Sequence, residues 1–502
     1  MSKVYTFHET VRGHLHVLNE FPCEDSSVSF SAENGKYYIA VVADGHGSKA
    51  CFRSDYGSKA ATEVTENILK QLAEAVLESE EIEDRFYKDL FSNPRYRQMT
   101  IRRLTDTIIA EWHDRVLEDY NNNPPNEEEM GEYAVEYEGG KNIPHIYGTT
   151  LIAALQLPKC LILLHQGDGR CDVFYSNGTV DQPIPWDKRC EDTATTSLCD
   201  EDVADSFRSC VINLDEKPVV ACFLGCDGVE DAYRDTYEEL GGSHVLMGGV
   251  HTFFKDLICK LASMDQAAFE SYLRDMLPDF SANGKFSRSG SGDDVSVAGI
   301  VDMDSIKSLA PGFEYDVKRY ALEEDLFWKE DELRGKTRKH GILRKRMDEA
   351  LSAFEEAQSK LSQVEDELQQ QRIQREKYAL CVEQAKADLE AYRQESESAT
   401  EQFDGRYSRF AVAVQRFFDE ISTGYSQKEA AYRKMLERLL DLDKKIEALD
   451  ADRVQLTATV SELSNKYTDA KNAFEEYDAK YQEIANEKAK IECEIDSLKG
   501  TD

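Results

Sequence analysis

Residues 435–498 carry an apolar repeat that limits the fold more than any other feature of the sequence. From Met435 to Leu498, apolar residues recur at spacings that alternate between four and three, and only Arg453 and Lys488 interrupt the series. Such a seven-residue repeat is typical of a coiled coil, in which one stripe of each helix is buried against a partner helix. The sequence therefore predicts a long helical arm at this end of the chain.

A second apolar series runs from Met347 to Tyr392 with nearly the same spacing. The step from Leu361 to Val364 is three residues where four would continue the repeat, which predicts local overwinding. We expect the two series to fold back on each other as an antiparallel hairpin with its tip near residues 403–426. The alternative is a parallel homodimer in which that stretch separates two coiled-coil segments, because heptads do not fix chain direction.

The sequence before residue 310 has a different pattern, in which short β-prone runs alternate with longer helical stretches. The strand-like runs are KYYIAVVA, TTLIAAL, CLILLHQGD, RCDVFYS, PVVACFLG and DVSVAGIV. Strands followed by segregated helices favour an α+β domain over a doubly wound parallel sheet. We expect this domain over residues 1–310, a linker or helical connector over 311–341, and coiled coil over 342–502.

The net charge of -37 bears on the partners of this protein. So acidic a surface repels nucleic acid and anionic lipid and attracts divalent cations, so neither nucleic acid nor a membrane is an expected partner. The start MSKVYTFHET has no apolar signal core, and apolar runs such as CLILL are too short to cross a bilayer. The 12 cysteines show no paired framework. These features predict a soluble, cytoplasmic protein with reduced thiols.

Acidic residues stand beside glycine at the edges of several β-prone runs. Strands could gather these acids at one rim of a sheet, where their charges would repel one another unless cations neutralised them. Carboxylate oxygens are hard ligands that suit Mg²⁺ or Mn²⁺. A single Asp-Gly pair also marks an ordinary turn, so the set carries more weight than any member. The acids are Glu24, Asp25, Asp44, Asp168, Asp227, Asp293 and Asp294.

The order of these motifs resembles that of the metal-dependent protein phosphatases, the type 2C serine/threonine phosphatases, in their bacterial form. The matching stretches are GHLHVLNEFPCEDSS, VVADGHGS, YGTTLIAAL, HQGDGRCDVF, LGCDGVED and SGDDVSVAGIV. The resemblance covers about residues 8–302 and does not extend to the helical part. It implies a central antiparallel β-sandwich flanked by helices, with a binuclear Mn²⁺ or Mg²⁺ centre at one end.

The resemblance also implies roles for individual residues. Asp44 matches the carboxylate that bridges both ions, and the Gly45 carbonyl matches a ligand of one of them. Asp168 matches the acid of a third, weaker metal site, and Asp294 stands at the usual asparagine position behind the ligands. The acids that would complete the direct or water-mediated coordination are Asp25, Asp227 and Asp293, with Glu24 assisting.

The implied chemistry is attack on a phosphate ester by a hydroxide that bridges the two ions. His46 resembles the proposed general acid of the family, and its alternative role is to orient Asp44. Glu20 stands where many members carry an arginine that grips the substrate phosphate. His16, His14 or Arg12 is a candidate replacement, and the alternative is that these are ordinary strand residues.

The sequence therefore predicts a phosphatase for phosphoserine or phosphothreonine in a protein substrate, with an arm that selects substrates or partners. A protein partner would bind the coiled coil or its tip. One alternative is a catalytically weak or inactive domain that serves as a coiled-coil scaffold. Another is a phosphatase that acts on a small phosphate ester, because metal ions recognise the phosphoryl group alone.

Overall fold

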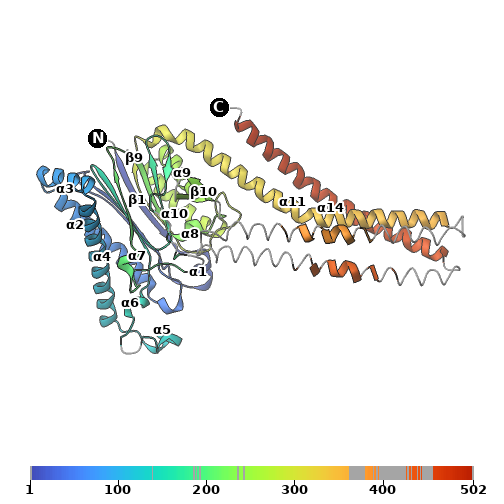
Figure 1. Ribbon diagram of the computed structural model, residues 1–502, viewed down its shortest axis with the longest axis horizontal. Helices are drawn as coiled ribbons and strands as arrows, with labels where there is room; N and C mark the ends of the chain where they lie inside the picture. The colour runs from blue at the N-terminus through green and yellow to red at the C-terminus, as the bar shows by residue number, and fades with distance from the viewer. Residues whose placement is uncertain are drawn as a thin grey trace. The chain divides into compact units, whose positions relative to one another are not determined.

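Two five-stranded antiparallel sheets lie face to face in the N-terminal part of the computed structural model (Figure 1). The structure describes residues 3–360 and 456–499, except for 138–139, 185–186, 188, 191–193, 235–236 and 241–243, and adds scattered helical residues between 379 and 443. The first sheet has the order β1 (Val4–Val11), β12 (Val295–Asp302), β9 (Val219–Gly225), β6 (Arg170–Tyr175) and β7 (Val180–Asp181). The second has the order β2 (Ser26–Ser31), β3 (Tyr38–Ala43), β4 (Leu151–Leu157), β5 (Cys160–Gln166) and β8 (Arg208–Asn213). A separate pair is formed by β10 (Tyr237–Leu240) and β11 (His244–Met247).

Three apolar clusters divide this part of the chain into four layers. The cluster between the sheets includes Val42 and Ile152 from one sheet and Leu224 and Ile300 from the other. Both faces of the inner strands are therefore buried, which explains why they read as continuous apolar runs rather than as alternating patterns. The layers are helices, sheet, sheet and helices. The predicted α+β class with a central antiparallel β-sandwich flanked by helices is confirmed.

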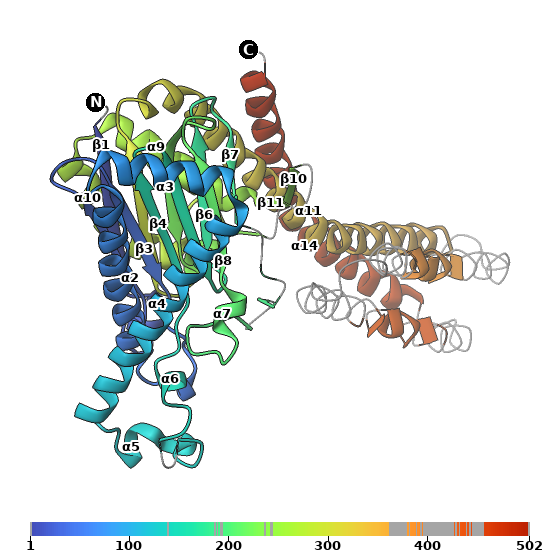
Figure 2. The ribbon, with the colours of Figure 1, turned by 60° about the vertical axis from the view of Figure 1, so that its left-hand side comes forward.

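The outer clusters bury helices against each sheet, as Figure 2 shows for the helices on the β2–β8 side. On that side Trp112 is fully buried, and its indole N–H donates to the Gly57 carbonyl at 2.9 Å. On the other side, the rings of Phe223 and Phe254 stack at 5.2 Å between centroids. The helices of the first layer are α2 (Ser54–Val76), α3 (Glu80–Ser92) and α4 (Pro94–Asn122), and those of the second are α9 (Gly248–Ser263) and α10 (Gln266–Asn283).

Local sequence signals set the starts of the outer helices. Asn93 caps α4, because its side-chain oxygen accepts from the Tyr96 N–H at 3.2 Å, and Pro94 follows at the first helical position. Ser79 caps α3 in the same way through the Ile82 N–H at 3.3 Å. The shorter helices are α1 (His14–Asn19), α5 (Glu127–Met130), α6 (Ile143–Ile146), α7 (Val203–Ser206) and α8 (Asp227–Glu230).

The chain divides into two compact units, one of Met1–Glu324 with the last residues of the chain and one of Asp325–Ser497. The sequence placed this boundary at 310. Helix α11 (Ile306–Lys360) is continuous through the predicted connector, and its first turns bury Phe313 in the cluster beneath α9 and α10. The first unit therefore includes part of α11.

The second unit contains α14 (Leu456–Lys499), which pairs with α11 in the antiparallel direction. Lys329 bonds to Glu487 at 2.6 Å, and His340 bonds to Asp478 at 2.6 Å. All but the last residue of the predicted tip, 403–426, lie outside the described residues, as does most of the repeat between 361 and 455. The hairpin with its tip therefore stays a prediction. None of the described helices combines the length and apolar composition that a membrane span requires.

Candidate metal centre

Strand register places the predicted acids at one end of the sandwich. Asp25 immediately precedes β2 and Asp44 immediately follows β3, and the neighbouring strand residues Ser26 and Ala43 are paired. In the other sheet, Gly225 at the end of β9 is opposite Arg170, the first residue of β6, and Val297, the third residue of β12. The loops that carry Asp168, Asp227 and Asp293 therefore reach the same region as Asp25 and Asp44.

The electrostatics of this end show that the acids are close together. Burial raises the pKa of Asp25 well above its usual range, and the neighbouring carboxylates of Asp294 and Asp227 raise it further. The pKa of Asp44 is likewise raised well above its usual range, first by burial and then by the charge of Asp25. The pKa of Asp227 is also raised well above its usual range, by burial and then by Asp44. Carboxylates so placed cannot all ionise without a positive charge between them.

Asp25 also carries an oxygen with an unmet bonding requirement. The side chain is buried, and its Oδ2 has no hydrogen-bond partner among the described residues. Donor atoms of Asp25, Asp44 and Cys226 lie within 4.8 Å of one another. A divalent cation would satisfy this oxygen and offset the repulsion, so the residues present fit the metal that the sequence predicts.

The backbone around Asp44 is held by the start of the neighbouring strand. The Asp44 carbonyl accepts from the Thr150 N–H at 2.8 Å and from the Thr149 hydroxyl at 2.8 Å, and the Asp44 N–H donates to the Thr150 hydroxyl at 3.1 Å. A Cβ at Gly45 would lie 2.4 Å from the Glu24 carbonyl oxygen. Glycine is therefore required here, because only a residue without a side chain allows the two loops to approach.

Glu24 and Asp168 are further acids of this region, and the charge of Asp168 acts on Asp44 and Asp227. Glu24 accepts from the Ser54 hydroxyl at 3.1 Å, and burial raises its pKa to about 7. The pKa of Asp168 is raised by burial, and that of Asp293 is raised by burial as well. All the acids predicted as ligands thus lie in surroundings that favour neutralisation by a cation or a proton.

His46 follows Gly45 and is held next to the start of the neighbouring strand. Its backbone N–H donates to the Gly148 carbonyl at 3.0 Å, and a Cβ at Gly148 would lie 2.5 Å from His46 Cδ2. Burial and, to a smaller extent, the nearby His145 together lower the pKa of His46 to about 4. The imidazole is therefore neutral near pH 7, which favours an orienting role over proton donation.

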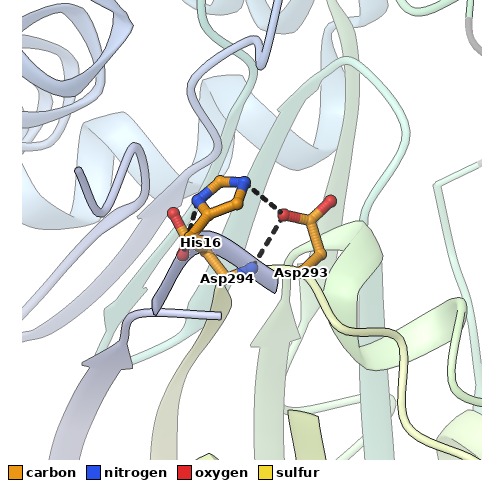
Figure 3. Close-up of side chains that lie close together, drawn as sticks. All are labelled: His16, Asp293 and Asp294. Atoms are coloured by element: carbon orange, nitrogen blue, oxygen red, sulfur yellow. Dashed lines mark hydrogen bonds and ion pairs between the residues drawn. The ribbon is translucent and has the colours of Figure 1, made fainter. Parts of the chain in front are cut away.

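His16 lies between the two adjacent acids of the SGDD motif (Figure 3). Its Nε2 is 3.4 Å from Asp293 Oδ1, and its Nδ1 is 3.0 Å from Asp294 Oδ1. Arg12 is exposed, and its guanidinium donates to the His16 carbonyl at 2.9 Å. His16 belongs to α1 and Arg12 precedes that helix, so the alternative that they are strand residues is wrong. Of the candidates for phosphate binding, His16 is the one that contacts the acidic cluster.

Asp294 has a larger structural role than its sequence position suggests. Its Oδ2 accepts from the Glu24 N–H at 2.6 Å, and its Oδ1 accepts from the Gly13 N–H at 2.5 Å. This buried carboxylate therefore joins the loops that carry His16, Glu24 and Asp293. The sequence shows Asp294 only as the second acid of SGDD. Gly13 and Glu24, the residues that it bonds, are far from it along the chain.

Cys226, which precedes Asp227 in the GCDG motif, also lies in the cluster. Its sulfur accepts from the Ser296 N–H at 3.1 Å and lies beside Asp25 and Asp44. Burial raises the pKa of the thiol well above its usual range, and the neighbouring acids raise it further. The thiol is therefore neutral in the metal-free protein and packs between the two sheets.

Comparison with known proteins agrees with the motifs. A family model described as Protein phosphatase 2C matches residues 12–277, while no curated protein matches the chain. Similar solved structures include a bacterial serine phosphatase, at 17% identity over 60% of this chain and 98% of that chain, with a TM-score of 0.33. The serine/threonine phosphatase Stp1 from Staphylococcus aureus has 16% identity over 60% of this chain and 95% of its own, with a TM-score of 0.33.

A third similar structure is the catalytic domain of the serine/threonine protein phosphatase PstP in complex with two manganese ions. It has 14% identity over 59% of this chain and 97% of its own, with a TM-score of 0.32. The family match spans more than half of the present chain and ends before the helical arm. The chain therefore belongs to the protein phosphatase 2C family, the metal-dependent phosphatases that act on serine and threonine in proteins.

Proposed function

We propose that this chain hydrolyses phosphoserine or phosphothreonine in protein substrates with a binuclear Mn²⁺ or Mg²⁺ centre. The observation that carries the proposal is the unpartnered, buried Oδ2 of Asp25 beside Asp44, in a cluster whose carboxylates raise one another's pKa. The residues that would hold the ions are Asp25, Asp44, Asp227 and Asp293, the Gly45 carbonyl, Glu24 in support, and Asp168 for a third ion.

When bound, the ions would lower the pKa of a shared water and offset negative charge on the phosphoryl oxygens. The protein's own residues would fix the geometry around them. Thr149 and Thr150 hold the Asp44 backbone, and Asp294 holds the loop of Glu24. Neutral His46 would orient its neighbours, while the departing serine or threonine oxygen would take its proton from solvent or from a group on the substrate.

His16 is the residue that we assign to the substrate phosphate. Its ring lies against Asp293 and Asp294, with the side chain 15% exposed, so it can both reach the site and be held in orientation by carboxylates. Arg12 is a weaker candidate, because its guanidinium donates to the His16 carbonyl and makes no ion pair with the acids that the structure describes.

The arm formed by α11 and α14 would select partners or substrates. Its paired helices expose charged side chains, such as Lys480 and Glu476, and the described residues of the arm contain no second acidic cluster of the kind found at Asp44. Whether the arm pairs within one chain or between two is decided by measuring the mass of the full chain in solution by sedimentation.

The deciding experiment measures hydrolysis of a phosphothreonine peptide by the full chain, with Mn²⁺ or with chelator. An Asp227→Asn variant should lose turnover, while Asp215→Asn, at an exposed turn, should keep it. Turnover that requires both metal and Asp227 supports the proposal. No peptide turnover from a folded protein whose melting temperature rises with Mn²⁺ would contradict it. Hydrolysis of p-nitrophenyl phosphate would then separate a phosphatase for small esters from an inactive scaffold.

A further inference from the structure

A basic stretch opens α4 in an otherwise acidic unit. Residues 93–105, NPRYRQMTIRRLT, contain four arginines and no acid, whereas residues 1–310 together carry 28 lysines and arginines against 54 aspartates and glutamates. These arginines take no part in the candidate metal centre. This local reversal of charge, on a protein of net charge -37, gives the stretch electrostatic complementarity to an acidic partner.

The stretch borders a groove of about 760 Å³ between α4 and the segment that leads into β8. The groove is open to solvent, and its lining combines arginines with apolar side chains. Met99 is 44% exposed there, and Phe207 and Val211 are half-buried. Its lining includes Arg97, Met99, Ile101, Arg103, Phe207 and Val211.

Two of the lining arginines are available for a partner. Arg102 is engaged, because its guanidinium bonds to Asp205 at 3.1 Å and to Asp106 at 2.9 Å and so holds α7 against α4. Arg97 and Arg103 make no side-chain hydrogen bond or ion pair with any residue that the structure describes. Of these three arginines, Arg102 stabilises the fold, and Arg97 and Arg103 do not.

The groove also runs along an open sheet edge. β8 is the last strand of its sheet and, within the described part of the chain, pairs only with β5. The outer N–H and C=O groups of an edge strand can bond to a further strand. Ser209 and Val211, which share one face of β8, line the groove, so an added strand would pass directly beneath α4.

We propose that this groove binds an extended acidic segment of a partner protein, which adds to the edge of β8. Arg97 and Arg103 are separated by about 9 Å of helix rise, and strand residues i and i+4 are about 13 Å apart. Acids at those two positions can meet the two flexible arginines, while an apolar residue at i+2 covers Met99. The recognised pattern is acid-x-apolar-x-acid.

The test uses a fluorescein-labelled peptide of three Glu-Ser-Leu-Ser repeats and the full chain, followed by fluorescence anisotropy. The double substitution Arg97→Glu with Arg103→Glu should weaken binding by about tenfold or more, since each rim charge pair is reversed. The matched control, Arg85→Glu with Lys88→Glu, makes the same charge change at exposed positions of α3 outside the groove. The control should change the dissociation constant less than about twofold. Equal weakening by both pairs, or no saturable binding by the unsubstituted protein, would overturn the proposal.

Two further measurements separate this binding mode from its competitors. Met99→Lys adds a positive charge but removes an apolar contact, so it should weaken binding, and stronger binding would show that charge alone acts. Peptide binding should slow amide hydrogen exchange in residues 208–213, and binding without that protection would overturn the added strand. If Arg97→Glu with Arg103→Glu instead dissociated a dimer in sedimentation, the occupant would be a second copy of this chain. The inference does not rest on phosphatase chemistry, because each readout measures binding.

Discussion

The Nδ1 atom of His16 lies 3.0 Å from Oδ1 of Asp294, a carboxylate that also accepts two backbone N–H groups from separate loops. One buried acid therefore fixes both the loop of the candidate ligands and the ring that we assign to the substrate phosphate. The histidine is held in place by a residue that need not touch either metal or phosphate. Binding of substrate and retention of metal can accordingly be separated by substitution at His16.

His16→Ala should raise the KM for a phosphothreonine peptide about tenfold and leave kcat within about threefold. The reason is that one charge-assisted contact to the phosphate, about 1.4 kcal/mol, would be lost while the carboxylate cluster stayed intact. Steady-state kinetics at saturating Mn²⁺ checks this expectation. His14→Ala is the matched control, because His14 is exposed on the same helix. A fall in kcat at unchanged KM would show that His16 acts on the reaction rather than on binding.

Asp25→Asn should make the metal-free protein more stable and its response to Mn²⁺ weaker. The substitution removes a buried negative charge next to Asp294 and Asp227, so we expect a gain of about 1–3 kcal/mol in the free energy of unfolding without metal. Thermal melts with chelator and with Mn²⁺ measure both effects. Asp215→Asn should change neither. An Asp25→Asn protein that melted lower than wild type in chelator would contradict the repulsion argument.

Asp172 supplies a pH dependence that is independent of the metal centre. The side chain is fully buried on β6, its Oδ1 accepts from Gln182 at 2.7 Å, and its Oδ2 has no hydrogen-bond partner among the described residues. Burial raises its pKa to about 7. Because the folded state holds this proton more tightly than the unfolded state, its contribution to stability is complete below about pH 4 and is lost as pH rises through 7.

Asp172→Asn should therefore stabilise the protein more at pH 8 than at pH 5, with a difference of about 1–3 kcal/mol between the two pH values, because the loss accumulates between about pH 4 and pH 7. The amide cannot ionise, and its oxygen can still accept from Gln182. Chemical denaturation of both proteins at the two pH values, with the same chelator present, measures the difference. A stability difference that did not change between pH 5 and pH 8 would show that Asp172 does not titrate in this range.

The sequence was sufficient to predict the cluster because most of its acids flank strand ends. Asp44 ends the run YYIAVVA and Asp25 begins the next paired strand, so antiparallel pairing alone brings them together. The roles of Asp294 and Cys226 depend instead on the approach of loops from opposite ends of the chain. Spacing along the sequence carries no information about that approach, which only the packed sandwich determines.

The boundary near residue 310 illustrates the same limit. Pro311 and Gly312 are residues that commonly end a helix, but α11 runs through both. Pro311, the sixth residue of α11, removes one backbone hydrogen bond of the helix without ending it. The sequence feature that marks the true extent of the domain is the apolar pair Phe313 and Val317, which are one helical turn apart and both buried. Two positions are too few to be recognised as an amphipathic face without the partner helices.

A chain that ends at Lys329 should keep the stability of the phosphatase unit, whereas a chain that ends at residue 310 should lose it. The shorter chain lacks Phe313 and Val317, and it leaves Arg234 without Glu324, whose Oε2 accepts from Arg234 Nε at 2.8 Å. Loss of one buried aromatic side chain alone costs about 3 kcal/mol or more, which lowers the melting temperature by roughly 5–10 °C. Differential scanning calorimetry and turnover of p-nitrophenyl phosphate compare the two chains. Equal melting temperatures would show that the first turns of α11 do not belong energetically to the catalytic unit, and that the boundary lies at 310.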